Sequence, residues 1–238
     1  KTKKILIALS LIAAVSTQVF AAEKPAEYKE YNRLSWEQMQ EITNPNRLGH
    51  RIFYKASQGP DAKWFDAVKK GDLPTIKAMV AKGQNLEAKD EANLNQTALG
   101  WAAFIGYMDI VEYLVDQGAD LYATDKADVT SSFKSAVLGG NIQVIKYLYP
   151  KVKDHIDLDA QDERDDETAL MVAVWNDRKE AVEFLIEKGA KVNIYAKKID
   201  ENALSYAYKQ NNLKIAKILL DAGADLPEGH KKINIKNL

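Results

Sequence analysis

The stretch that decides the fold is Thr97-Ala98-Leu99-Gly100-Trp101-Ala102-Ala103, because copies of it recur along the chain. Residues 168–174 read Thr-Ala-Leu-Met-Val-Ala-Val, 71 positions later, and residues 202–208 read Asn-Ala-Leu-Ser-Tyr-Ala-Tyr after a further 34. A weaker copy, Ser-Ser-Phe-Lys-Ser-Ala-Val, occupies residues 131–137. A fixed period of this length indicates a repeat architecture, in which one supersecondary unit is stacked many times.

Each copy is followed at a constant distance by a second apolar stretch, at residues 110–114, 144–148, 181–185 and 215–219. Three units then close alike, with Gly118-Ala119-Asp120-Leu121, Gly189-Ala190-Lys191-Val192 and Gly223-Ala224-Asp225-Leu226. An earlier unit fits 35 positions upstream, from Trp64. The pattern predicts a helix with an N-cap at Thr97 or Thr168, a stop at Gly106 or Gly140, and a second helix. One such unit cannot bury its apolar face alone, whereas a stack can.

This pattern resembles the ankyrin repeat, with its period of about 33 residues and its Thr-Pro-Leu-His-x-Ala signature. The resemblance implies an all-α ankyrin-repeat solenoid of five units, at about residues 61–90, 91–125, 126–162, 163–196 and 197–226. The Pro of the signature is replaced by Ala or Ser and its His by Gly, Lys, Met or Ser. The third unit lacks the Gly-Ala-Asp close and carries extra residues, so we expect its second helix to end near Tyr149, before an irregular excursion through His155.

Residues 1–21 have the three parts of a secretory signal peptide: a lysine-rich head, an apolar run through residue 15, and small residues at the end. We expect cleavage after Ala21 rather than after Ala22, which would put bulky Phe20 at a small-residue position. A buried N-terminal helix and a retained anchor are the alternatives, although the apolar run is shorter than the roughly 20 residues that span a bilayer. The expected mature protein is soluble and, with no cysteine, suits a bacterial periplasm.

Residues 22–60 form an expected N-terminal extension. Ser35-Trp36-Glu37-Gln38 reads as a capping box that opens a short helix over residues 36–42. The segment is rich in aromatic residues, which are Tyr28, Tyr31, Trp36, Phe53 and Tyr54. We therefore expect it to pack over the first repeat as a cap, with a partner-binding arm as the alternative. A short tail follows over residues 227–238.

The composition excludes several classes of function. The 238 residues carry 33 Lys and Arg against 34 Asp and Glu, whereas nucleic-acid-binding proteins usually show a basic excess. The chain has no cysteine, which excludes disulfides, thiolate metal sites and a cysteine nucleophile. The histidines (His50, His155 and His230) are scattered, and no phosphate loop or nucleophile elbow is present.

The densest acidic run is Asp162-Glu163-Arg164-Asp165-Asp166-Glu167. It lacks the glycine and the spaced ligands of a calcium loop, so a solvated hairpin loop is favoured over a metal or catalytic site. The sequence therefore predicts no catalytic residue, no metal and no cofactor.

Binding residues are predicted from the repeat register. The residues that follow the alanine pair of each first helix should face the concave groove: Phe104, Ile105, Leu138, Trp175, Asn176 and Lys209. Large aromatic residues at such places are typical of binding hot spots, although Phe104 and Trp175 could instead pack against neighbouring first helices. The hairpin tips should supply a rim of mixed charge: Glu91, Asn93, Asp125, Lys126, Arg164, Asp165, Tyr195 and Lys197.

These observations together predict an exported, non-enzymatic protein that binds a protein partner, and neither nucleic acid nor a membrane. Similar exported proteins suggest two roles: an immunity protein that neutralises an envelope-directed toxin, or a periplasmic accessory to a catalase in oxidative stress. An envelope scaffold is a third, separate hypothesis. The residues alone do not separate the three.

Overall fold

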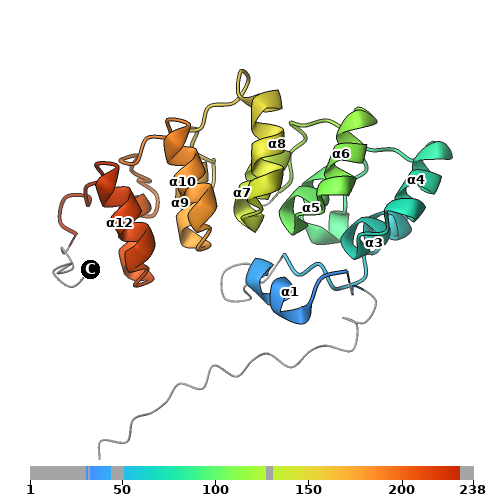
Figure 1. Ribbon diagram of the computed structural model, residues 1–238, viewed down its shortest axis with the longest axis horizontal. Coiled ribbons are helices and arrows are strands. Elements are labelled where there is room, and N and C mark those ends of the chain that lie inside the picture. The colour runs from blue at the N-terminus through green and yellow to red at the C-terminus, as the bar shows by residue number, and fades with distance from the viewer. Residues whose placement is uncertain (1–30, 32, 44–50, 127–130, 231–238) are drawn as a thin grey trace, which may run out of the picture.

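The computed structural model describes residues 31, 33–43, 51–126 and 131–230, and these residues form a curved stack of helix pairs (Figure 1). The regular elements in this part of the chain are helical, apart from two isolated bridges that close the hairpins at Asp90–Gln96 and Ala196–Glu201. The predicted fold class, an all-α solenoid, is confirmed.

Each of five units contributes one pair of antiparallel helices. The first helices of the pairs are α3 (Ala62–Lys70), α5 (Ala98–Ile105), α7 (Ser132–Gly139), α9 (Ala169–Trp175) and α11 (Ala203–Lys209). The second helices are α4 (Leu73–Ala81), α6 (Met108–Asp116), α8 (Ile142–Val152), α10 (Lys179–Glu187) and α12 (Leu213–Asp221). A short 3-10 turn, η2 (Glu91–Asn93), lies in the second unit's hairpin.

The predicted helix boundaries follow from local capping. The hydroxyls of Thr97 and Thr168 accept hydrogen bonds from the N–H groups of Gly100 and Met171, which have no partner within the helix. Gly106 ends α5 in the left-handed region, at φ 93°, where a side chain would be strained. The two threonine caps and the glycine stop are therefore confirmed.

The predicted end of the third unit's second helix near Tyr149 is wrong, because α8 continues to Val152 with Pro150 inside its last turn. Proline lacks the N–H that would bond back to Lys146, but the next turn is closed when Lys153 N–H donates to the Tyr149 carbonyl. Val152 is fully buried and fixes this extra turn against the core. The irregular stretch through His155 therefore begins only after Val152.

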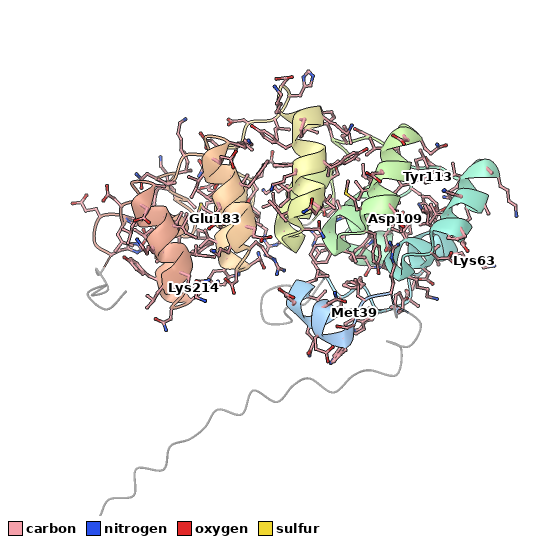
Figure 2. All side chains as sticks on the ribbon, in the orientation of Figure 1. Met39, Lys63, Asp109, Tyr113, Glu183 and Lys214 are labelled. Carbon is pink, nitrogen blue, oxygen red and sulfur yellow. The ribbon has the colours of Figure 1, made fainter. Side chains whose placement is uncertain are left out.

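The N-terminal extension contains α1 (Trp36–Ile42), as its capping box predicts. Ser35 Oγ accepts from Gln38 N–H at 3.2 Å, and Gln38 Oε1 accepts from Ser35 N–H at 2.8 Å. Met39 is fully buried against the array (Figure 2). However, α1 is not confined to the first repeat, since it lies beneath several helix pairs in Figure 1.

The expected signal peptide, with Ala21 and Ala22 at its end, and the end of the tail from residue 231 lie outside the described residues. Within the part that is described, no helix is both long and apolar enough to cross a bilayer.

Candidate binding groove

The face formed by the first helices and hairpins is covered in its N-terminal half by residues 51–57 of the same chain. Ser57 N–H donates to Asp66 Oδ1 at 2.7 Å, and the Ser57 hydroxyl donates to Asp90 Oδ2 at 3.0 Å. Lys69, on α3, donates from Nζ to the Lys55 carbonyl at 2.6 Å. The segment is therefore held by both main-chain and side-chain hydrogen bonds, as a bound peptide would be.

Arg51 anchors the other end of this segment. Its Nη2 lies 2.9 Å from Asp125 Oδ2, and its guanidinium lies 6.0 Å from the centre of the Phe104 ring. Both charged side chains are 1% exposed. Burial of a charge is costly unless it is paired, so the two side chains depend on each other.

Burial contradicts the exposure that was expected for part of the predicted groove. Phe104, Ile105, Leu138 and Asn176 were expected to present exposed surface, but all four are buried. Phe104 lies under Arg51, and the amide of Asn176 turns back to donate to the Val172 carbonyl. Of the predicted groove residues, Lys209 is exposed and Trp175 is half-buried.

Two arginines fasten α1 along the same side of the array. Arg178 donates from Nη1 and Nη2 to the carbonyls of Glu41 and Ile42 at the end of α1, and from Nε to the Leu138 carbonyl. Arg33 donates to the Gly71 carbonyl and pairs with Asp109 at 2.6 Å. The extension therefore reaches from the first unit to the fourth, which corrects the expectation of a cap over the first repeat.

Sequence reasoning missed the three arginines at positions 33, 51 and 178 as contact residues. The only signal for them is the residue type, because the chain uses lysine for most of its cations. Arginine offers a planar set of donors that suits several acceptors at once, as Arg178 illustrates.

The C-terminal half of this face, on the fourth and fifth units, carries aromatic and charged side chains. The Trp175 ring lies 4.8 Å from the Tyr206 ring, centre to centre, so the alternative that Trp175 packs on a neighbouring first helix is correct for part of its surface. The Tyr206 hydroxyl donates to Glu167, and Lys209 pairs with the buried Glu201.

Burial governs the electrostatics of the pair formed by Glu167 and Tyr206. Desolvation raises the pKa of Glu167, and the hydrogen bond from Tyr206 acts in the opposite direction. The pKa of Tyr206 is raised as well, first by burial and then by the neighbouring Glu167 carboxylate. The phenol therefore stays protonated and keeps its role as a donor.

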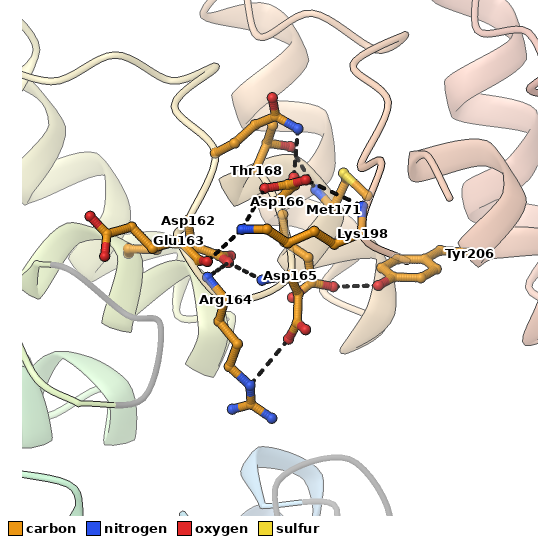
Figure 3. A network of polar contacts seen from close by, with 12 residues as sticks. Asp162, Glu163, Arg164, Asp165, Asp166, Thr168, Met171, Lys198 and Tyr206 are labelled. Atoms are coloured by element: carbon orange, nitrogen blue, oxygen red, sulfur yellow. Dashed lines mark hydrogen bonds and ion pairs between the residues drawn. The ribbon is translucent and has the colours of Figure 1, made fainter. Parts of the chain in front are cut away.

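The acidic run is a hairpin tip organised by internal hydrogen bonds (Figure 3). Asp162 Oδ1 accepts from the N–H groups of Arg164 and Asp165. Lys198, from the next hairpin, pairs with Asp166 at 3.0 Å and donates to the Glu163 carbonyl. Among the described residues, no group of three His, Asp or Glu side chains is placed to hold a metal ion.

The predicted rim residues differ in accessibility. The exposed ones are Glu91, Lys126, Arg164, Tyr195 and Lys197, whereas Asn93 and Asp165 are half-buried. Asp125 was expected on the rim, but its side chain lies beneath Arg51 and is inaccessible. Of the exposed rim residues, Arg164, Tyr195 and Lys197 belong to the fourth and fifth hairpins, whereas Glu91 and Lys126 belong to earlier ones.

Stacked helix pairs joined by projecting hairpins define the class of helical repeat solenoids. A family model described as ankyrin repeats matches residues 64–162 and 133–229, so the chain belongs to the ankyrin-repeat family. Ankyrin repeats generally bind protein partners.

Several relatives are similar to this chain. It is 29% identical over 63% of its length to "Ankyrin repeat and KH domain-containing protein mask-1" of Caenorhabditis elegans. It is 29% identical over 64% to "Palmitoyltransferase AKR1" of Lachancea kluyveri, where the match covers only the ankyrin part. It is 32% identical over 52% to a "Putative ankyrin repeat protein" of Rickettsia felis. The matches span 6%, 20% and 39% of these relatives' own lengths.

Proposed function

We propose that the protein binds a partner protein, without catalysis, through the concave face of its fourth and fifth units. The observation that carries this proposal is the contrast between the two halves of the face. In one half, residues 51–57 are hydrogen-bonded to α3 and to the next hairpin, and Arg51 lies over the ring of the buried Phe104. In the other half, Lys209 and Arg164 are exposed and Trp175 is half-buried against Tyr206.

The charge of this surface favours a folded protein as the partner. Arg164, Lys197 and Lys209 alternate with Asp165 and Asp200, so neither sign dominates. A polyanion such as nucleic acid would require a basic stripe. A central aromatic residue within a polar rim is instead typical of protein interfaces.

We further propose that binding takes place after export, in a bacterial periplasm. The lysine head, apolar run and small residues of positions 1–21 support this placement. Among the possible roles, we place neutralisation of an envelope-directed toxin first, because a groove lined by an aromatic residue and charged tips suits occlusion of an active site. A catalase accessory and an envelope scaffold are the other two roles.

The experiment is a pull-down from an envelope extract, followed by affinity measurement with the partner identified by mass spectrometry. A double variant, Trp175→Ala with Arg164→Ala, should weaken binding by about thirtyfold or more, as for loss of an interface hot spot. The matched control is Tyr113→Ala with Lys214→Ala, which removes an aromatic residue and a cation from the second helices (Figure 2).

The control should bind as the wild type does. Equal affinity of the groove variant and the control, with both folded by circular dichroism, would refute the proposed surface. A captured toxin, catalase or envelope protein would then decide among the three roles.

A further inference from the structure

One position recurs in three hairpins as the aspartate of an Ala-x-Asp triplet, namely Asp90, Asp125 and Asp162. In the first two, Oδ2 accepts a hydrogen bond from the N-terminal extension: Ser57 donates to Asp90 and Arg51 donates to Asp125. A second donor, Trp101 Nε1 or Gln96 Nε2, completes each site. The Oδ2 atoms of Asp90 and Asp125 therefore each accept two hydrogen bonds.

The third carboxylate, that of Asp162, lacks such donors at Oδ2. Asp162 is 7% exposed, and its Oδ2 accepts no hydrogen bond, although Oδ1 is bonded within the hairpin. The Lys134 ammonium lies 3.7 Å from Oδ2, which compensates the charge without supplying a hydrogen bond. A buried acceptor left in this state is costly, so the group that would complete the site is a neutral donor rather than a second cation.

Asp90 shows the same arrangement in its completed form. The ammonium of the buried Lys69 is close enough to Asp90 for their charges to interact. The hydrogen bonds to Asp90 Oδ2 nevertheless come from neutral groups, the Ser57 hydroxyl and the Trp101 indole, each at 3.0 Å.

A cavity of about 290 Å³ lies beside Asp162 and is lined mainly by residues of the third unit. Its walls are largely apolar, with Tyr122, Phe133, Ile156 and Leu158, and its polar lining includes Lys134 and Asp162. An apolar cavity of about 150 Å³ is already large enough to hold a benzene ring. Asp162 Oδ2 itself is buried from solvent, so the carboxylate must turn toward the cavity before a bound group can reach it. With that rotation the site fits a ring that carries one hydrogen-bond donor.

The chain itself shows which ring meets this requirement. Tyr206 donates its phenol hydroxyl to Glu167, on the same hairpin as Asp162, with its ring buried (Figure 3). We propose that this cavity receives a tyrosine side chain of the partner protein, with its hydroxyl donating to Asp162 Oδ2. This inference rests on the proposed function, because it names a residue that the partner presents.

The test uses the full chain and two probes, N-acetyl-tyrosinamide and N-acetyl-phenylalaninamide, titrated while amide resonances are followed by NMR. The tyrosine probe should shift the resonances of residues around the cavity and bind about tenfold more tightly than the phenylalanine probe, because only its hydroxyl can satisfy Oδ2. Asp162→Asn should remove this preference. The matched control Asp159→Asn, outside the cavity lining, should keep it.

A second variant addresses the cavity without changing the carboxylate. Ala160→Trp fills the cavity from its wall and should abolish binding of both probes. Absence of saturable shifts, or equal binding of the two probes, would overturn the inference. Binding of p-cresol without the tyrosine probe would also overturn it, since the cavity would then exclude a peptide-borne phenol.

This assay needs no partner, so its failure is separate from that of the proposed function. If the cavity prefers the tyrosine probe but the Trp175 and Arg164 double variant still binds the partner, the phenol site is supported and the proposed surface is refuted. If the double variant loses partner binding but the cavity shows no preference for tyrosine, the proposed surface is supported and the phenol site is refuted.

Discussion

Glu167 illustrates how single residues set the energetics of this fold. Its carboxylate is largely buried at the hairpin tip, near Asp162 and Asp165, and its pKa is raised above the ordinary value of 4.5 by desolvation. The Tyr206 hydroxyl offsets part of this cost by a hydrogen bond to the charged form. The Tyr206 hydroxyl and, to a smaller extent, the charge of Lys134 therefore stabilise the ionised carboxylate of Glu167.

Tyr206→Phe should lower the free energy of unfolding by about 2 kcal/mol at about pH 7.5, since a hydrogen bond to a charged group is lost. Without the donor, the folded-state pKa of Glu167 rises further. A group whose folded pKa is raised loses folding stability as the pH rises from the unfolded value, near 4.5, through the folded one. The defect of the variant should therefore shrink as the pH falls through that window and Glu167 is protonated in the folded state.

Urea denaturation at about pH 7.5 and about pH 5 measures this difference. The control is Tyr208→Phe, on the same helix, where the hydroxyl of a buried tyrosine makes no hydrogen bond to a described residue. A Tyr206→Phe defect that is the same at both pH values would show that the hydroxyl acts by packing rather than through the charge of Glu167.

At the scale of the elements, the sequence predicted whatever is periodic or local. The helix pairs follow from the repeated heptads, and Thr97 and Gly106 fix the ends of α5 through their own backbone chemistry. The end of α8 was predicted too early, just before Pro150. A proline in the last turn removes only one hydrogen bond, and the buried Val152 holds the helix beyond it.

The candidate groove was predicted less well, for a physical reason. Phe104 and Trp175 occupy the same position of the repeat, so the repeat pattern predicts the same exposure for both. One difference between them is Arg51, which lies over the Phe104 ring, 74 positions from its partner Asp125, and belongs to no repeat. Contacts of this kind depend on the path of a non-periodic segment, which neither periodicity nor local propensity encodes.

The attachment of α1 gives a prediction at this scale. Arg178→Ala removes three hydrogen bonds, two of which hold the last carbonyls of α1. Amide hydrogen exchange over residues 33–43 should accelerate about tenfold or more, because a seven-residue helix is marginal without tertiary contacts. The neighbouring Lys179→Ala, which removes an exposed ion pair with Glu183, should leave this exchange unchanged. Unaltered protection of α1 in the Arg178 variant would mean that the apolar contacts of Met39 suffice.

At the scale of the whole molecule, the extension ties together units that would otherwise contact only their nearest neighbours. Arg33 and Arg178 connect α1 to the first, second and fourth units, and Arg51 reaches the hairpin of the third. These hydrogen bonds and ion pairs join the extension to the first four units. The fifth unit should therefore be the least strongly coupled part of the array, since in repeat proteins stability is a sum of unit and interface contributions.

A matched series of leucines tests this gradient. Leu114, Leu148, Leu185 and Leu219 occupy the same position of four successive second helices, and all are fully buried. Leucine to alanine at such sites costs about 3 kcal/mol. Leu114→Ala and Leu148→Ala should lower the main urea midpoint, because the extension couples their units to the rest. Leu219→Ala should instead open α11 and α12 separately, with fast hydrogen exchange there and a nearly unchanged midpoint for the remainder. A common shift of one cooperative transition in all four variants would show that stacking alone couples the array from end to end.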